Sequence, residues 1–306
     1  MKKNCLLCFL LFFSCHSALA GESLDSLLNV LDKTIKEADT YVQIKENKLH
    51  ELKKEARKTP PFSVERYNLN NDIYLEYKAY SSDSALHYLN ENMLLARQLN
   101  DKERELKIQL ELSYLLSSIG MYMEAADILN SIDRQTLPSS LLGHYYTCYE
   151  HVYFEAGAAQ PRYKMFASRY VKLSHAYRDS MQITLDPSSA TYLWLRETQL
   201  REAGKYDEAL EFSDRRLAES SFGTPQYALV AYQRFRLFES MGKKDEHLYY
   251  LVLSAISDVR SAIKEQSSLM VLAQELNSKG DLQRAYDYIT FSWEISQFYK
   301  TRLRSL

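Results

Sequence analysis

The sequence predicts an all-α fold in which helical hairpins stack into a solenoid, and three observations support this prediction. Nearly every segment has the apolar spacing of an amphipathic helix, and no β-branched run alternates cleanly. Glycine and proline are scarce, with 8 and 6 copies in 306 residues, and most of them fall between the helical segments. A motif of glycine followed five residues later by alanine also recurs, which marks a stacked array of repeats: Gly120–Ala125, Gly204–Ala209 and Gly280–Ala285.

Each position of this motif has a physical role at a turn between two helices. Glycine adopts the left-handed conformation that ends a helix, and alanine lets the two helices approach closely. The residue two positions after the glycine is expected to pack into the angle between the helices, and it is Tyr122, Tyr206 or Leu282. A degraded copy begins at Gly242, which lies 38 residues after Gly204 and 38 before Gly280. Because His247 replaces alanine there, we expect that helix pair to be splayed or polar at its crossing.

The first predicted helix is long, from Leu24 to Lys58, and occupies a segment of its own over residues 21–60. It ends at Thr59-Pro60-Pro61 because proline disfavours helix in the residue before it. Its apolar residues repeat in steps of three and four, as in a heptad seam: Leu24, Leu28, Leu31, Ile35, Ala38, Val42, Leu49 and Leu52. Two interpretations follow, in which the helix either lies along the next helix pair or forms a coiled-coil homodimer.

Six helix pairs are predicted for the rest of the chain, over residues 61–306. Their boundaries follow the apolar spacing and the glycine and proline positions. The pairs are Val64–Ala79 with Ser84–Gln98, Glu103–Ile119 with Tyr122–Ile132, Ser139–Glu155 with Tyr163–Tyr177, Ser188–Ala203 with Asp207–Glu219, Pro225–Ser240 with Glu246–Lys264, and Ser267–Lys279 with Leu282–Arg304.

Residues 1–20 are predicted to be a secretory signal peptide that is cleaved after Ala20. A basic start at Lys2 and Lys3 precedes a short apolar run, and Ala18-Leu19-Ala20 has the small residues of a cleavage site. The alternative is a lipoprotein leader cut before Cys15, although the aromatic residues ahead of it fit that signal poorly. We therefore expect an exported, periplasmic protein that is tethered to a membrane only through a lipid or through a segment of a longer form.

Composition argues against several classes of protein. Cleavage leaves Cys148 as the only cysteine, so no disulfide within the chain is expected. The leader carries two lysines and no acid, so its removal lowers the formal charge from −2 to −4, and an acidic chain without a basic stripe binds nucleic acid poorly. After the leader, no apolar run is long enough to cross a membrane. Metalloprotease, phosphate-loop and nucleophile-elbow motifs are missing, so we expect no enzyme, no catalytic residue and no cofactor.

Two groups of side chains stand out as candidate sites. His144, Cys148 and His151 share one helical face and have the chemistry of zinc ligands, but no fourth ligand is evident, so no metal is expected. Tyrosines crowd two other helical faces, where they either pack between helices or line a groove that binds peptides or stacks on sugars. The tyrosines proposed for such a groove are Tyr145, Tyr149 and Tyr249.

The glycine motif resembles the tetratricopeptide repeat, in which glycine ends the first helix, an aromatic residue follows and alanine lies early in the second helix. Gly204, Tyr206 and Ala209 match that pattern best. The N-terminal stretches 25–32 and 73–80 look like the sensor half of a Bacteroidetes family of membrane-anchored regulators, catalogued as a domain of unknown function. This resemblance implies an exported tetratricopeptide-like domain that is followed, in full-length members, by a transmembrane helix, a coiled coil and a helix-turn-helix DNA-binding end.

From these observations we expect a non-enzymatic, exported interaction domain. It would bind a peptide, protein or glycan on its helical array, bind no nucleic acid itself, and act as the sensor of a transcriptional regulator. Ligand binding would alter an adjoining segment or a dimer interface. The alternative function is a free-standing periplasmic or lipid-anchored scaffold in envelope assembly or glycan uptake.

Overall fold

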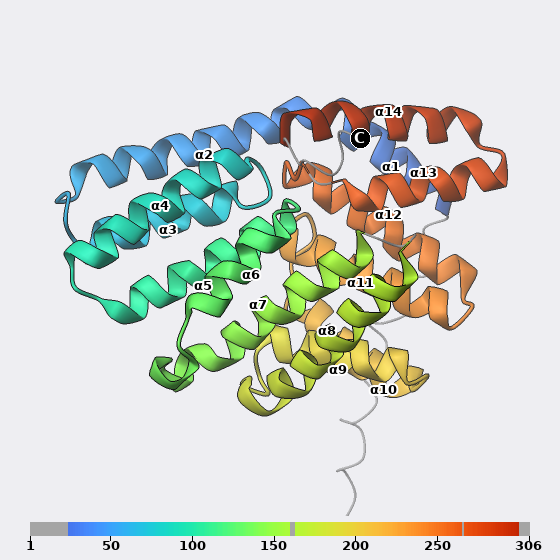
Figure 1. Ribbon diagram of the computed structural model, residues 1–306. Coiled ribbons are helices and arrows are strands. Elements are labelled where there is room, and N and C mark those ends of the chain that lie inside the picture. Colours follow the sequence, from blue (N-terminus) through green and yellow to red (C-terminus); the bar gives the residue numbers. More distant parts are fainter. Residues whose placement is uncertain (1–23, 160–162, 265, 300–306) are drawn as a thin grey trace, which may run out of the picture.

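The computed structural model describes residues 24–159, 163–264 and 266–299, and every regular element within these ranges is helical (Figure 1). The predicted all-α class is therefore confirmed, while the predicted signal peptide lies outside the described residues. In chain order the helices are α1 (Leu24–Lys36), α2 (Ala38–Lys58), α3 (Val64–Tyr77), α4 (Ser82–Gln98), α5 (Lys102–Ser118), α6 (Tyr122–Ser131), the 3₁₀ turn η1 (Arg134–Thr136), α7 (Ser139–Ala158), α8 (Lys164–Thr184), α9 (Ala190–Glu202), α10 (Tyr206–Ala218), α11 (Pro225–Ser240), α12 (Lys244–Arg260), α13 (Ser267–Lys279) and α14 (Leu282–Tyr299).

The six predicted helix pairs are present as six hairpins, from α3/α4 to α13/α14, and neighbouring hairpins pack on one another in chain order. The predicted boundaries differ most at α8, which continues to Thr184 where the sequence analysis ended it at Tyr177. The predicted end of the last helix, at Arg304, lies outside the described residues. The array is thus a solenoid of helical hairpins, as the recurring glycine motif indicated.

The prediction of one continuous helix from Leu24 to Lys58 is wrong, because Glu37 interrupts it with φ −94° and ψ 7° and separates α1 from α2. The two halves of the apolar seam belong to different cores. Leu28 and Leu31 pack with residues of α11 to α14, whereas Leu49 packs with α3 and α4. These three leucines are at most 2 % exposed, so the seam lies inside the protein and offers little surface for a coiled-coil dimer.

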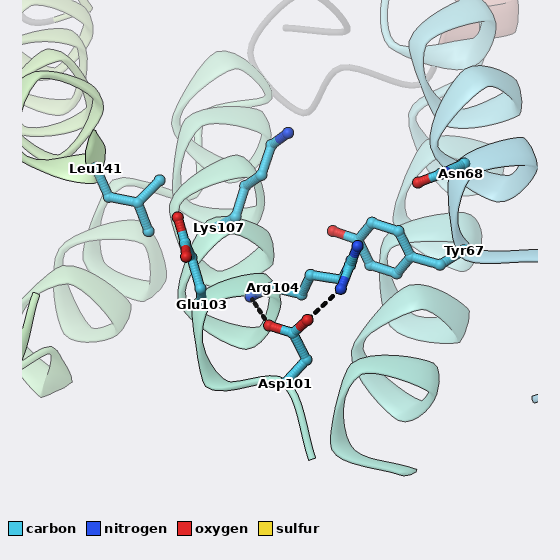
Figure 2. A pocket seen from close by; sticks show the side chains of 7 residues that line it. All are labelled: Tyr67, Asn68, Asp101, Glu103, Arg104, Lys107 and Leu141. Atoms are coloured by element: carbon cyan, nitrogen blue, oxygen red, sulfur yellow. Dashed lines mark hydrogen bonds and ion pairs between the residues drawn. The ribbon is translucent and has the colours of Figure 1, made fainter. Parts of the chain in front are cut away.

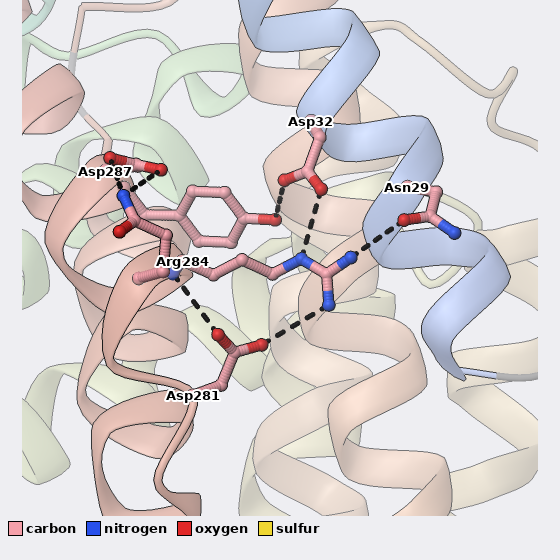
Figure 3. Close-up of polar contacts among 7 residues, drawn as sticks. Asn29, Asp32, Asp281, Arg284 and Asp287 are labelled. Atoms are coloured by element: carbon pink, nitrogen blue, oxygen red, sulfur yellow. Dashed lines mark hydrogen bonds and ion pairs between the residues drawn. The ribbon is translucent and has the colours of Figure 1, made fainter.

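Helix α1 joins the beginning of the chain to its last two hairpins (Figures 1 and 3). Beyond its buried leucines, Asp32 accepts hydrogen bonds from the Tyr288 hydroxyl at 2.6 Å and from Arg284 Nε at 3.0 Å, both on α14. Arg284 also donates to the Asn29 amide oxygen at 2.8 Å. The connection between α12 and α13 adds a backbone bond of 3.0 Å from the Lys264 N–H to the Ala79 carbonyl at the end of α3. The solenoid is therefore closed on itself, because its two ends are in contact.

Glycine occupies the left-handed region at the turns where the motif predicted it. After Gly204, the N–H of Lys205 donates to the carbonyl of Leu200 at 2.9 Å, which satisfies a carbonyl that the helix end would leave free. Asn100 has φ 54° and takes the same role between α4 and α5. The turn glycines have φ of 87°, 74°, 71° and 87° at Gly120, Gly204, Gly242 and Gly280.

The alanines of the motif are buried, at 0 % exposure for Ala125 and Ala209 and 7 % for Ala285. The expectation for the residue two positions after the glycine is only partly met. Tyr122 and Tyr206 are partly buried, whereas Leu282 is 63 % exposed and does not pack into the angle between α13 and α14. The last hairpin therefore presents an apolar residue to solvent where the earlier ones bury it in part.

The degraded copy of the motif gives a polar crossing and not a splayed pair. Helices α11 and α12 pack along their length, with the rings of Phe238 and Tyr250 stacked at 5.4 Å. His247 lies edge-on to the Phe235 ring at 5.4 Å, and its Nε2 is 4.0 Å from a Glu275 carboxylate oxygen on α13. A histidine is accommodated at the alanine position because its ring packs on an aromatic side chain while its nitrogen faces an acid.

Buried ion pairs hold together the helices of two consecutive hairpins, α7/α8 and α9/α10. Arg178 on α8 donates from Nε to Glu150 on α7 at 2.8 Å and from Nη1 to Glu202 on α9 at 3.0 Å. The Arg178 and Glu150 side chains are 5 % and 3 % exposed. A second buried pair, between Arg216 and Glu197, joins α10 to α9. A charge left alone at such a place is costly, so the two buried pairs make the helices of each hairpin depend on each other, and the bond from Arg178 to Glu202 adds a link from α8 to α9.

We predict that Glu150→Ala lowers the free energy of unfolding by about 3–5 kcal/mol, because Arg178 would keep a buried charge without its closest partner. Urea denaturation followed by circular dichroism measures this loss. The matched control is Glu239→Ala, which removes a pair with Arg236 whose side chains are 47 % and 49 % exposed and should cost about 0–1 kcal/mol. Equal losses in the two variants would contradict the structural role of the buried pair.

Candidate functional site

A pocket of about 290 Å³ opens between α3, α5 and the start of α7 (Figure 2). Its walls come from the first helices of three consecutive hairpins, which is where helical repeat proteins form their extended binding surfaces. The lining side chains are Tyr67, Asn68, Asp101, Glu103, Arg104, Lys107 and Leu141. We call this pocket, together with the polar residues that continue it along α3, α5 and α7, the α3–α5–α7 groove.

One wall of the pocket is fixed by the start of α5. Asp101 caps this helix by accepting from the Arg104 N–H at 3.0 Å, and it also pairs with the Arg104 guanidinium. Those interactions, with the backbone bond the largest, lower the pKa of the Asp101 carboxyl. Arg104 lies in turn over the ring of Tyr67, 5.1 Å from its centre. The cap therefore holds a charged side chain and an aromatic ring in fixed positions at the pocket.

The other polar groups of the pocket are open to solvent. Lys107 and Asn68 are both exposed, and Figure 2 shows the Lys107 ammonium directed away from the Asp101–Arg104 pair. Glu103 accepts a hydrogen bond from the Ser140 hydroxyl at 3.1 Å, which ties α5 to α7. The pocket thus combines a preformed polar wall with an ammonium, an amide and a carboxylate that a ligand can reach.

A polar network continues the groove along the same faces of α3, α5 and α7. Its centre is Glu111, which accepts from the Tyr74 hydroxyl at 2.7 Å and from Lys78 Nζ at 3.3 Å. His144 Nε2 is 3.6 Å from the other Glu111 oxygen. Burial favours the neutral carboxyl, but Lys78 and His144 outweigh it and hold the pKa of Glu111 below its usual range. The network therefore holds charged side chains of the same three helices in place beside the pocket.

Comparison with known proteins identifies the family of the chain. The sequence matches the family described as the SusR N-terminal TPR domain over residues 35–306. The chain belongs to this family. The match confirms the resemblance to the tetratricopeptide-like domain of a Bacteroidetes regulator family, and it agrees with the hairpin array of the structure. None of the curated proteins compared with the chain matches it.

As a TPR domain, the chain is of a type that mediates protein–protein interactions and is typically not catalytic. Within residues 24–159, 163–264 and 266–299, no helix is both long and apolar enough to span a membrane. The groove agrees with an interaction role, because it presents many polar groups over three hairpins.

The three residues considered for zinc binding do not converge. The Cys148 thiol is fully buried and donates to the Leu110 carbonyl at 3.4 Å, and burial raises its pKa. His144 faces Glu111, while His151 stacks on the Tyr114 ring at 3.9 Å. Among the residues that the structure describes, no three His, Cys, Asp or Glu side chains are placed to hold a metal ion.

The tyrosines proposed for the groove lie elsewhere. Tyr145 and Tyr149 are 7 % and 5 % exposed in the core between α6, α7 and α8, and Tyr149 stacks on Tyr177 at 4.6 Å. Tyr249 is partly buried and lies edge-on to Tyr250 at 5.3 Å. All three tyrosines therefore pack between helices, which was the other interpretation of their pattern in the sequence. The residues that do line the pocket are not tyrosines of α7 or α12 but polar side chains of α3 and α5, with Leu141 of α7.

A signal for those residues is present in the sequence. Arg104, Lys107, Glu111 and Tyr114 follow one another in steps of three and four, so they form a polar stripe on one face of α5. Such a stripe on an amphipathic helix is usually assigned to solvent. Only the position of α5 between α3 and α7 turns this stripe into a groove wall.

We predict that acid destabilises the domain through His151. Burial lowers the pKa of its imidazole to about 3, whereas the unfolded value is about 6.5. Because the folded state keeps His151 neutral, the unfolded state binds more protons between these values, and stability falls as pH falls below about 6.5. His151→Gln should remove about 1–2 kcal/mol of the loss between pH 7 and pH 5, measured by urea denaturation.

The control for this measurement is the same substitution at His50, which is exposed on α2. His50→Gln should leave the dependence of stability on pH unchanged. A His151→Gln protein that loses as much stability as the wild type between pH 7 and pH 5 would contradict the burial of a neutral imidazole at this position.

Proposed function

We propose that this chain is the exported sensor domain of a membrane-anchored transcriptional regulator and that it binds its ligand in the α3–α5–α7 groove. The observation that carries the proposal is the groove itself, a pocket of about 290 Å³ with a polar network beyond it on three consecutive hairpins. Membership in the SusR N-terminal TPR domain family supports a sensor or interaction role. The predicted signal peptide supports a periplasmic location.

The lining of the pocket indicates the chemistry of the ligand. Two acids, Asp101 and Glu103, and two bases, Arg104 and Lys107, balance in formal charge, and Asn68 adds a neutral donor and acceptor. A strongly charged ligand would gain little from such a balanced site. A polypeptide segment or a glycan fits better, because each offers alternating donors and acceptors with little net charge.

A route exists from the groove to the rest of the array. Glu76, on α3, holds two lysines of α2: Lys45 at 2.7 Å and Lys48 at 2.5 Å. Helix α2 continues through Glu37 into α1, which contacts α14. A ligand that moved α3 relative to α5 would therefore act on the contact between α1 and the last hairpin. This path connects the groove to a second contact in the array. A ligand in the groove could therefore shift the equilibrium between two arrangements of that contact, as sensing requires.

The test is a screen of peptide and glycan arrays with the exported domain. A ligand found there should bind at least about tenfold more weakly to Lys107→Ala and to Asn68→Ala, because each variant removes a polar contact to the ligand. Lys102→Ala is the matched control, since this lysine of α5 is 83 % exposed and does not line the pocket. A ligand whose affinity is unchanged in both groove variants would contradict the proposed site.

A further inference from the structure

A pocket of about 150 Å³ between α2, α3 and α4 carries a local excess of positive charge. Lys53 and Arg57, one turn apart on α2, line it together with Arg66 of α3. Glu91 of α4 is the only acid in the lining. Within the part of the chain that the structure describes, none of these four charged side chains forms an ion pair. Because the whole chain has a formal charge of −2, this group of unpaired cations is a local feature.

Two side chains of α3 are placed to receive a ligand in this pocket. Arg66 donates from Nε to Thr59 Oγ1 at 2.8 Å and from Nη2 to the Thr59 carbonyl at 2.9 Å, which fixes the guanidinium and leaves its Nη1 donors unused. Asn70, one turn further along α3, is only 6 % exposed. Its amide has no hydrogen-bond partner among the described residues. Because buried polar groups are normally paired, Asn70 indicates that the pocket accepts a polar ligand.

The cations of α2 lie beside an aromatic side chain of α4. The Lys53 ammonium is held by a hydrogen bond of 2.6 Å to the Tyr77 hydroxyl. Burial raises the pKa of the Tyr88 hydroxyl, and the nearby positive charges of Lys53 and Arg57 oppose that rise. Both cations therefore act on the same hydroxyl, which itself lines the pocket and can donate a hydrogen bond.

We propose that this pocket binds a phosphate group, either free or as the monoester of a larger ligand. Three cations against one acid match an anion with two negative charges better than a carboxylate with one. Donors from α2, α3 and α4 surround the space, as a tetrahedral group with several acceptor oxygens requires. Glu91 lies at the rim, where it can accept from a protonated oxygen of the phosphate or from a neighbouring hydroxyl of the ligand.

This site is separate from the α3–α5–α7 groove, since the two share no lining residue. A phosphate bound here would bridge α2 to α3 and α4 near the end of α2. The ion pairs of Glu76 with Lys45 and Lys48 tie α2 to α3 nearer the start of α2. Bound phosphate would therefore add a second connection that holds α2 on the first hairpin.

The experiment is an NMR titration of the isotope-labelled exported domain with inorganic phosphate at about pH 7.5, in sodium chloride of matched ionic strength. Saturable amide shifts are expected in residues that line the pocket, with a dissociation constant of about 1 mM or tighter. Arg57→Gln should weaken binding by about tenfold or more, because it removes a charge-assisted hydrogen bond. The matched control is Lys58→Gln, which removes the same charge from the next, exposed residue outside the pocket and should leave the affinity within about twofold.

A second variant tests the contribution of α3. Asn70→Asp keeps the shape of the side chain but adds a negative charge to the pocket wall, so saturable binding should be lost while the helical circular dichroism spectrum is retained. No saturable shift up to about 50 mM phosphate, or equal affinities in Arg57→Gln and Lys58→Gln, would overturn the proposal.

Two further ligands identify the bound group. Acetate that binds as tightly as phosphate would overturn the assignment to a doubly charged, tetrahedral anion. A hexose phosphate that binds more tightly than inorganic phosphate would assign the pocket to a phosphate monoester, whereas tighter binding of inorganic phosphate would assign it to the free ion.

Discussion

The packing of α1 against α12 and α14 is the contact on which the rest of this structure depends. Leu27, Leu28 and Leu31 are at most 4 % exposed there, and burial of three leucines stabilises the contact by roughly 5–8 kcal/mol before the entropy of ordering the helix is counted. The pair between Asp32 and Arg284, with side chains 30 % and 23 % exposed, is worth about 0–1 kcal/mol. Apolar burial therefore closes the solenoid, while the polar contacts set the register of α1 on α14.

Closure changes what a repeat array can do. In an open solenoid each hairpin contacts only its neighbours, so a disturbance spreads one hairpin at a time. Here α1 and α2 connect the hairpin that forms one wall of the groove to the last hairpin. A change at the groove can thus reach the last hairpin through α1 and α2, without passing through each hairpin in turn. Because the helix is interrupted at Glu37, α1 can pack on the last hairpins while α2 packs on the first.

Local rules predicted most of the fold and little of the site. The turn glycines, the prolines at helix boundaries and the buried alanines each follow from backbone conformation or close packing, so Gly204, Pro225 and Ala209 could be assigned from their neighbours in sequence. The closure of the solenoid could not be predicted in this way, because the residues that make it are 252 to 256 positions apart. The spacing of apolar residues along a helix also does not show which other helix they pack against. The groove was missed for the same reason, since the stripe of α5 becomes a wall only beside α3 and α7.

Amide hydrogen exchange of a Leu31→Ala variant, read by mass spectrometry, tests the closure most directly. Leu31 is fully buried among residues of α11 to α14, so the cavity should cost about 3–5 kcal/mol and speed exchange in α12, α13 and α14. Exchange in α5 and α6, whose buried residues belong to other cores, should change far less. Faster exchange confined to α1, α2 and α3, with α12 to α14 as protected as in the wild type, would show that the array is open and contradict this account.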